Sequence, residues 1–232
     1  NVRPSFKVLE EGEALPNRNY QFVKCHIFYV KMEDFRQKAR LVAGGHLTKA
    51  PATITYASVV SRETVRLALT FASLNDLEVK VGDVLNAYIT APVKEMVWTT
   101  LGPEFGLDSG KSAIIVRVLY GLKSAGAAFR AHLASFMRQM GYTSCKADPD
   151  LWMKAVTRPD DNVRYYAYIL CYVDDILCIL FRAAVANPDN CFATTVPLLS
   201  NSGKDKNKPL THNMKNICIN KKTVSQVASE YR

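Results

Sequence analysis

The chain has 232 residues, of which 48% are hydrophobic, and it carries a formal net charge of +9 at pH 7. This length and composition predict a globular protein with a buried core, organised as one large domain or two small ones, and exclude a disordered chain. The positive charge favours a polyanionic partner such as nucleic acid, although net charge alone is a weak signal.

Neither a membrane span nor a disulfide framework is expected. No apolar run reaches the roughly 18–20 residues that a spanning helix needs, and the N-terminus has no signal-peptide pattern. The six cysteines show no C-x-x-C spacing, which indicates reduced thiols and an intracellular protein that is not secreted. The first residue is Asn, not Met, which indicates a fragment of a longer polypeptide.

The N-terminal part of the chain predicts a basic β-hairpin. Residues 1–19 are polar and turn-rich, whereas residues 20–30 and 38–43 have the β-branched and aromatic content that is typical of strands. A charged turn joins these strands, so they would form an antiparallel pair that carries Lys38 and Arg40. Taken alone, these two cations indicate only a solvated strand face.

A helix and a strand follow the hairpin. Ser61 is suited to be the N-cap of a helix over residues 62–74, whose apolar side chains are spaced along one face. Residues 77–84 predict a strand, and Asp83 near its end lies where loops usually build sites. A break in the regular secondary structure is expected at Pro92. Asp83 alone would also fit a plain turn.

The middle of the chain predicts further strands and a second helix. The strands cover residues 97–100, 114–119 and 151–156, and the helix runs from about residue 127 to 140 and ends at Gly141. This order of elements indicates an antiparallel sheet with helices packed on one face. The predicted fold class is α+β.

Two adjacent acids interrupt an apolar run over residues 165–181. The flanking residues favour two strands joined by a tight turn, so Asp174 and Asp175 would lie at the tip of a hairpin. Ionised carboxylates are costly in such surroundings unless a cation compensates them. A second pair, Asp160 and Asp161, lies in a polar turn where acids are simply solvated. The contrast favours metal binding by the first pair.

Residues 187–232 differ in character from the rest of the chain. They are rich in Asn, Ser, Thr, Lys and Pro and show no sustained periodicity. We expect a divergent basic tail that is unstructured and solvated, although its cations could also touch nucleic acid.

Five short segments stand out as motifs along the chain. They are Lys38-Ala39-Arg40-Leu41-Val42-Ala43-Gly44-Gly45, Asp83-Val84-Leu85-Asn86-Ala87-Tyr88, Leu119-Tyr120-Gly121-Leu122-Lys123, Lys146-Ala147-Asp148-Pro149 and Tyr172-Val173-Asp174-Asp175. Together they resemble the reverse transcriptase domain of copia-type LTR retrotransposon polyproteins. Each motif alone is weak, but their shared order and family-like spacing make the resemblance strong.

The resemblance implies a right-hand polymerase, here its fingers and palm. Residues 1–60 would form a fingers-like segment, with residues 97–125 partly in the fingers, and residues 61–96 and 126–186 would form the palm. In residues 187–232 we find neither the helical palm segment nor the primer-gripping strands that the family would place next. Thumb, RNase H and integrase regions are not recognisable.

The resemblance also assigns a catalytic site. Asp83, Asp174 and Asp175 would be the catalytic carboxylates and, with the backbone at Val84, would hold two Mg²⁺ ions, with Mn²⁺ as an alternative. Two such ions about 3.5–4 Å apart lower the pKa of an attacking 3′-hydroxyl and stabilise the leaving pyrophosphate. Mg²⁺ prefers oxygen ligands from carboxylates and substrate phosphates.

Other residues would contact the incoming nucleotide. Lys38 and Arg40 are similar to fingers residues that neutralise the triphosphate, and the sequence does not assign which of them does so. Tyr88 resembles a steric gate, whose ring would exclude the 2′-hydroxyl of a ribonucleotide. An aromatic side chain packed in the core is nearly as good an interpretation of Tyr88. The resemblance also implies roles for Tyr120, Gly121 and Lys123 in backing the nucleotide and template, and for Tyr172 and Val173 in the hairpin motif. An ordinary strand-to-helix turn is the alternative for the first three.

The implied partners are an RNA or DNA template with its primer, a deoxynucleoside triphosphate and the remaining polyprotein segments, without a membrane. The implied location is a cytoplasmic particle or the nucleus. Because the family pattern stops at Phe181, one alternative is a catalytically inactive nucleic-acid-binding remnant of a degenerate retrotransposon. A metal-dependent phosphohydrolase is a less favoured one. Whether the chain is an active RNA-directed DNA polymerase thus stays open.

Overall fold

The computed structural model of the chain describes residues 5–31, 37–52, 54–158, 161–181 and 217–220. The backbone divides into two compact units. Unit 1 consists of Asn1–Ala57 and Ala87–His132, and unit 2 consists of Ser58–Asn86 and Leu133–Arg232. The protein is a mixed α and β structure with several sheets and few helices.

Each unit has its own sheet and at least one helix. The elements of unit 1 are β1 (Phe6–Val8), β2 (Gln21–Phe22), β3 (Cys25–Lys31), β4 (Gln37–Ala43), α2 (Ala87–Thr90), β6 (Val97–Thr100) and β7 (Ser112–Ile115), with short 3-10 turns at Gly45–Leu47 and Pro103–Asp108. Those of unit 2 are α1 (Arg62–Leu74), β5 (Leu77–Val84), β8 (Thr143–Ser144), β9 (Leu151–Thr157), β10 (Arg164–Tyr172), β11 (Asp175–Phe181) and β12 (Ile217–Asn220). Helix α3 (Ala125–Gln139) contributes its first half to unit 1 and its second half to unit 2.

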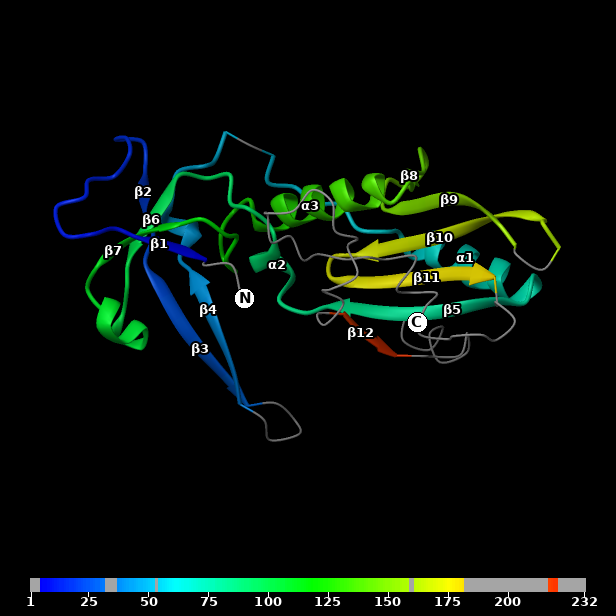
Figure 1. The fold of residues 1–232 in the computed structure, drawn as a ribbon, viewed down its shortest axis with the longest axis horizontal. Helices are drawn as coiled ribbons and strands as arrows, with labels where there is room; N and C mark the ends of the chain where they lie inside the picture. The colour runs from blue at the N-terminus through cyan, green and yellow to red at the C-terminus, as the bar shows by residue number, and fades with distance from the viewer. Residues whose placement is uncertain (1–4, 32–36, 53, 159–160, 182–216, 221–232) are drawn as a thin grey trace. The chain divides into compact units, whose positions relative to one another are not determined.

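Unit 2 is built on a six-stranded antiparallel sheet with the strand order β12-β5-β11-β10-β9-β8. The predicted hairpin is confirmed as β10 and β11, and β11 lies between β10 and β5 (Figure 1). The five central residues of β11 are all buried. Because successive side chains of a strand point to opposite faces, this strand must be covered on both faces of the sheet.

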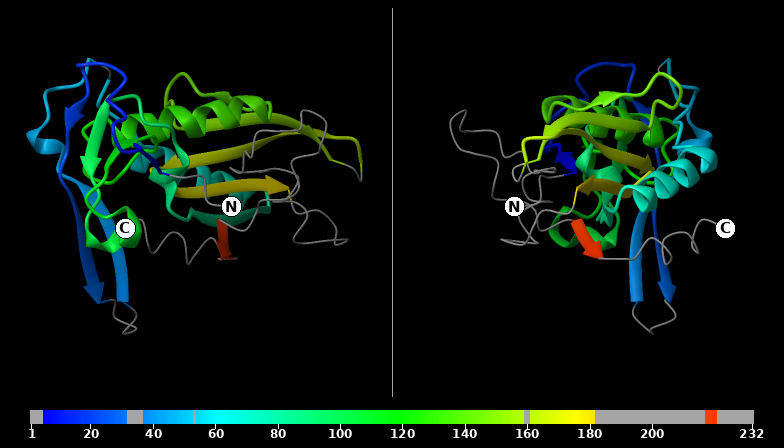
Figure 2. Two further views of the ribbon diagram at one scale, coloured as in Figure 1. Left: turned by 60° about the vertical axis from the view of Figure 1, so that its left-hand side comes forward. Right: turned by 90° about the vertical axis from the view of Figure 1, so that its right-hand side faces the viewer.

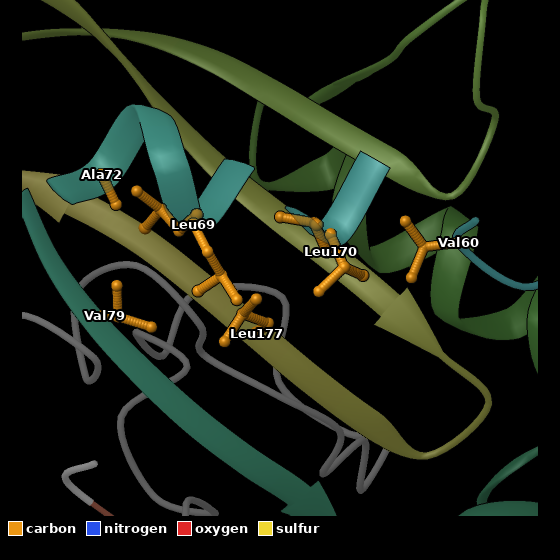
Figure 3. Packing of buried hydrophobic residues seen from close by; sticks show 8 residues of the cluster. Val60, Leu69, Ala72, Val79, Leu170 and Leu177 are labelled. Carbon is orange, nitrogen blue, oxygen red and sulfur yellow. The ribbon is translucent and has the colours of Figure 1, made fainter. Parts of the chain in front are cut away.

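Helix α1 covers one face of this sheet. Val65, Leu69 and Ala72 are buried and recur three or four residues apart, so they share one side of the helix. They form a single apolar cluster with strand residues and with the segment before the helix (Figure 3). The other members of the cluster are Val60, Val79, Leu170, Leu177 and Ile179. The side chain of Ser61 accepts a hydrogen bond from the N–H of Thr64 at 3.1 Å, which confirms the predicted N-cap.

The end of α3 covers the other face. Trp152 and Lys154 of β9 alternate with Leu151, which packs against the α1 cluster, so they point away from α1. The guanidinium of Arg138 lies 5.5 Å from the centroid of the Trp152 ring, and Lys154 donates to the C=O of Met140 at 2.8 Å. The prediction that the helices pack on one face is therefore wrong for this end of α3, because central strands that are apolar on both sides need cover on both.

Unit 1 contains a four-stranded sheet, in the order β1-β7-β6-β2, and the two-stranded hairpin of β3 and β4. The strands of the hairpin run side by side in both views of Figure 2. The single strand predicted over residues 20–30 is split into β2 and β3 because the chain changes its pairing partner. The N–H of Val23 donates to the C=O of Trp98 at 2.9 Å, and β3 then pairs with β4.

Two further segments differ from the predictions. Strand β7 ends at Ile115, short of the predicted residue 119, because the N–H of Val118 donates to the C=O of Ala91 at 3.0 Å and the chain leaves the sheet. Within the tail that was expected to be unstructured, residues 217–220 form β12 and pair with β5. The rest of the predicted tail lies outside the described residues.

Four of the cysteines in the described residues have free thiols, namely Cys25, Cys145, Cys171 and Cys178. Burial raises the pKa of Cys178 to about 12, so this thiol stays protonated and packs as a small hydrophobe. Along the described part of the chain, no helix is long and apolar enough to cross a membrane.

Candidate active site

Asp83, Asp174 and Asp175 lie together at one end of the unit 2 sheet. Asp175, the first residue of β11, is directly opposite Asp83 of β5 in the antiparallel register. The N–H of Val84 donates to the C=O of Asp174 at 3.0 Å, which holds the turn against β5. Directly opposed residues on antiparallel strands have Cβ atoms about 4.5–5.5 Å apart and share a face. Acids far apart in the sequence are thus neighbours in the sheet.

This arrangement costs stability unless a cation balances it, because like charges directly opposite each other destabilise a strand pair. Mg²⁺ is usually held by one or two protein carboxylates, and it takes its other oxygen ligands from water and substrate phosphates. Across the described residues, no group of three or more His, Cys, Asp or Glu side chains is arranged to hold a metal ion by itself.

The turn between β10 and β11 is tight and strained. Tyr172 pairs with Asp175, which leaves Val173 and Asp174 as a two-residue loop. Val173 has a φ of 56°, a region in which a β-branched residue is an outlier. A positive φ at the first loop position is typical of a type II′ turn, which normally has Gly there. Strain of this kind clusters at functional sites.

Replacing Val173 by Gly is expected to raise the free energy of unfolding by about 1 kcal/mol, because Gly adopts a positive φ without the steric cost that Val carries. Urea unfolding measures the change. Val163→Gly is the matched control, since Val163 is also exposed but has no positive φ, and it should destabilise. Loss of stability in both variants would show that Val173 is not strained.

Two further acids, Asp148 and Asp150, hold the turn end of the hairpin, and no role was predicted for them from the sequence. The carboxylate of Asp148 accepts from the N–H of Ser61 at 2.9 Å, and that of Asp150 accepts from the hydroxyl of Ser58 at 2.5 Å. The C=O of Asp150 accepts from the N–H of Cys171, near the end of β10, at 3.0 Å. Both acids are buried and join the start of α1 to the hairpin. The sequence signal for them is an Asp-Pro-Asp stretch next to a predicted N-cap.

Burial alone would raise the pKa of Asp148, but hydrogen bonds outweigh this effect. They come from the side chain of Thr64 and from the backbone N–H groups of Ser61 and Asp150, and together they lower the pKa below its ordinary value. An Asp whose pKa is lowered by folding stabilises the protein above its unfolded-state pKa of about 3.9. That contribution is lost as the pH falls through the lower, folded-state pKa.

Asp148→Asn is expected to lower the free energy of unfolding at neutral pH by about 1–2 kcal/mol, because a neutral amide oxygen accepts these hydrogen bonds more weakly than a carboxylate. The difference from the wild type should shrink below about pH 4, where the carboxylate of the unfolded chain becomes protonated, and should disappear as the pH falls through the lower pKa of the folded state. Urea unfolding across a pH series measures both effects. A difference that stays constant down to strongly acidic pH would contradict the role of the charge.

Unit 1 brings several predicted nucleotide-binding residues together around one ring. The guanidinium of Arg40 lies 5.3 Å from the centroid of the Tyr120 ring, and the Tyr88 ring meets the same ring edge-on at 4.7 Å. Tyr88 also contacts the ring of Phe129 at 5.9 Å. Tyr88 is half-buried in this aromatic cluster, whereas Arg40 is exposed. A cation and a second aromatic ring thus both contact Tyr120.

Gly121 and Lys123 lie between β7 and α3, and they hold this segment of the chain against the end of β4 and the residues that follow it. Gly121 has a φ of 89°, and a Cβ at this position would overlap the carbonyl oxygen of Ala43. The N–H of Ala43 donates to the C=O of Tyr120 at 2.7 Å. The ammonium of Lys123 donates to the C=O of Thr48 at 2.5 Å. Gly121 is therefore required by the close approach of two backbones.

The remaining predicted nucleotide-binding residue, Lys38, lies on β4 opposite Val30. All the predicted nucleotide-binding residues thus belong to unit 1, whereas the three acids and the hairpin belong to unit 2. The second acid pair of the sequence behaves as predicted where it is described: Asp161 is exposed in a turn and forms an ion pair with Arg158 at 3.0 Å. Asp160 lies outside the described residues.

Residues 14–184 match the family described as reverse transcriptase (RNA-dependent DNA polymerase). The match covers most of the chain and includes all three acids. The chain therefore belongs to this family, and the family predicted from the sequence is confirmed.

Similar proteins include Pol polyproteins of plant transposons. The retrovirus-related Pol polyprotein from transposon TNT 1-94 of Nicotiana tabacum is 30% identical over 190 residues, which cover 73% of this chain and 14% of the relative. Those from transposons RE2 and RE1 of Arabidopsis thaliana are 28% and 27% identical over 147 and 172 residues, which cover 61% and 70% of this chain. The chain spans only 10% and 11% of these two relatives.

Proposed function

We propose that the chain forms the fingers and palm of an RNA-dependent DNA polymerase, with unit 1 as fingers and unit 2 as palm. It would transfer a nucleotide from a deoxynucleoside triphosphate to the 3′-hydroxyl of a primer. The observation that carries the proposal is the register that sets Asp83 against Asp175, beside the turn that holds Asp174. Directly opposed residues of antiparallel strands share one face of the sheet, so one divalent cation can contact both carboxylates.

Asp83, Asp174 and Asp175 would hold two divalent cations, Mg²⁺ or Mn²⁺, with the backbone of Val84 beside them. When bound, such ions lower the pKa of the attacking hydroxyl and stabilise the charge of the leaving pyrophosphate. The protein's own contribution is to fix the carboxylates. The hydrogen bond from the N–H of Val84 fixes the turn, and the apolar cluster under α1 fixes β5 and β11.

In unit 1, Arg40 and Lys38 would neutralise the triphosphate. The planar guanidinium of Arg40 suits this task because it can donate two parallel hydrogen bonds to a phosphate, and its contact with Tyr120 limits the positions that it can adopt. Tyr120, Gly121 and Lys123 would back the nucleotide and template. The partners of the whole protein would be a template with its primer and the remaining segments of a Pol polyprotein.

Primer extension on an RNA template with deoxynucleoside triphosphates and Mg²⁺ tests this proposal. We expect extension that stops when EDTA removes the metal and resumes when Mg²⁺ or Mn²⁺ is restored. Salt-sensitive binding of the template and primer without extension would instead identify a non-catalytic remnant. Phosphate release from free nucleotides without a primer would indicate a phosphohydrolase.

Tyr88→Val is expected to reduce the preference for deoxynucleotides over ribonucleotides by about tenfold or more, or about 1.4 kcal/mol, because the ring that would exclude the 2′-hydroxyl is removed. Single-nucleotide incorporation rates with each nucleotide measure the preference. Tyr88→Phe keeps the ring and its contacts with Tyr120 and Phe129, so it should keep the preference. An unchanged preference in Tyr88→Val would leave Tyr88 as a core aromatic only.

A further inference from the structure

The start of α3 is held by a carboxylate from another segment of unit 1. Glu95 lies between α2 and β6, and one oxygen of its side chain accepts from the backbone N–H of Ser124 at 2.9 Å and from the Ser124 hydroxyl. Ser124 is buried, and its C=O accepts from the N–H of Ala128 at 2.9 Å. Because it directly precedes the helix, Ser124 is the N-cap of α3, and this cap is tied to Glu95.

This cap differs from an ordinary serine N-cap. The hydroxyl oxygen of such a serine normally accepts from N–H groups of its own helix, whereas the hydroxyl of Ser124 donates to Glu95. The negative charge of Glu95 is favourable at the N-terminus of a helix because of the helix dipole. Fixing a Glu side chain costs rotamer entropy, however, which a serine that caps its own helix does not incur. The contact therefore does more than begin a helix, because it also joins two segments that are 29 residues apart.

The two joined segments carry the aromatic cluster around Tyr88. Tyr88 lies on α2, in the segment that leads to Glu95, whereas Tyr120 precedes Ser124 and Phe129 lies on α3 after it. The Tyr88 ring meets the Tyr120 ring at 4.7 Å and the Phe129 ring at 5.9 Å. The contact between Glu95 and Ser124 thus joins the segment of Tyr88 to the segment that supplies both of these neighbouring rings.

A backbone hydrogen bond joins the same two segments at another point. The N–H of Val118 donates to the C=O of Ala91 at 3.0 Å. Val118 precedes Tyr120 in the chain, whereas Ser124 follows it, so Tyr120 lies between two points of attachment. Removing the side chain of Glu95 releases the second attachment and leaves the first in place.

We propose that Glu95 is a positioning residue for the sugar of the incoming nucleotide. Its carboxylate fixes the start of α3 and so the rings of Tyr120 and Phe129, which in turn fix the ring of Tyr88. Discrimination between a hydrogen and a hydroxyl at the 2′ carbon depends on where that ring lies, and a misplacement of about 1 Å can remove most of such an effect. This role of Glu95 rests on the proposed function, and within it on Tyr88 as the ring that excludes the 2′-hydroxyl.

Single-nucleotide incorporation of dATP and of ATP by the full chain, on a primed RNA template, tests this role. Glu95→Ala is expected to lower the preference for dATP by roughly threefold to tenfold, because a displaced ring excludes the 2′-hydroxyl less completely. A merely structural contact would lower both rates equally and keep their ratio. Glu13→Ala is the matched control. Glu13 is an exposed acid of unit 1 whose carboxylate also accepts from one backbone N–H, that of Glu10, and from one side chain, that of Lys7. This control should keep the preference.

Two further substitutions separate the reach of the side chain from its charge. Glu95→Gln keeps the length and an oxygen acceptor for Ser124, so it should keep most of the preference for dATP. Glu95→Asp keeps the charge but is too short for the same contact, so it should lose the preference as Glu95→Ala does. In a Tyr88→Val background, Glu95→Ala should lower the preference no further, because the ring that it positions is already absent.

Amide hydrogen exchange measures the same contact without any activity. Exchange in residues 119–129 is expected to be roughly tenfold or more faster in Glu95→Ala, because the N–H of Ser124 loses its acceptor and the start of α3 opens more often. Glu13→Ala should exchange like the wild type in this segment. Urea unfolding checks that each variant is folded, and Glu95→Asp replaces Glu95→Ala in both measurements if the latter does not fold.

Several results would overturn this role. They are an unchanged ratio of the two rates in Glu95→Ala, an equal loss of preference in Glu13→Ala, a further loss in the Tyr88→Val background, and a preference that Glu95→Asp keeps while Glu95→Gln loses it. The two proposals also fail separately. A wild type that extends primers, with an unchanged ratio in Glu95→Ala, removes only the role of Glu95. A wild type that extends no primer removes the polymerase function, and hydrogen exchange then decides whether Glu95 holds the rings, since unchanged exchange in Glu95→Ala would show that it does not.

Discussion

Asp174→Asn is expected to lower the rate of RNA-templated primer extension by about a thousandfold or more, which corresponds to about 4 kcal/mol of transition-state stabilisation. Asn has nearly the same size as Asp but no charge, so the variant should keep the turn and its hydrogen bond to Val84 while losing a metal ligand. Single-turnover extension with saturating Mg²⁺ measures the effect.

Asp161→Asn is the matched control for this substitution. Asp161 belongs to the other Asp-Asp pair, is exposed in a turn and forms an ion pair with Arg158. Exposed ion pairs contribute about 0–1 kcal/mol, so extension should continue at the wild-type rate. Normal extension by Asp174→Asn would remove the assigned mechanism, even if the chain is a polymerase.

Gly121→Ala is expected to lower the free energy of unfolding by about 2–5 kcal/mol. A positive φ costs an L-residue about 1–2 kcal/mol, and overlap of the new methyl group with the backbone of Ala43 adds about 1–3 kcal/mol. Because Tyr120 pairs with Ala43 through the same backbone contact, the variant should also disturb the ring that Arg40 and Tyr88 contact. Thermal and urea unfolding measure the loss.

Gly110→Ala separates the two causes. Gly110 has a φ of 83°, close to the 89° of Gly121, but a Cβ at Gly110 would have no neighbour within 4 Å. This control should lose only the backbone contribution of about 1–2 kcal/mol. Equal losses in the two variants would show that β4 and the loop can move apart, and that the close approach does not constrain Gly121.

Local elements and the family could be predicted because their signals lie within a few residues. The N-cap at Ser61, the helix behind it and the hairpin around Asp174 and Asp175 depend on capping, periodicity and β-propensity, which act over one or two turns of chain. The structure confirms each of them. The order of the motifs also sufficed to indicate reverse transcriptase, as the family match confirms.

Other features depend on contacts between distant segments and were missed or wrong. The split of the predicted strand at Val23 follows from a change of partner, and the buried hydrogen bonds of Asp148 and Asp150 exist only because β9, β10 and the start of α1 meet. The prediction that the helices pack on one face of the sheet was also wrong for the end of α3, which covers the other face. Local pattern cannot tell which segment covers an apolar strand.

The sequence by itself thus determined the class of protein, the hairpin that carries two acids and the presence of a third acid near the end of a strand. Only the tertiary structure decided that Asp83 is paired with Asp175, and not with a residue one position away. The physical reason is that side chains alternate along a strand, so a slip of one residue would turn Asp175 to the opposite face from Asp83. Register depends on the packing of the whole sheet against α1 and α3, which no single motif contains.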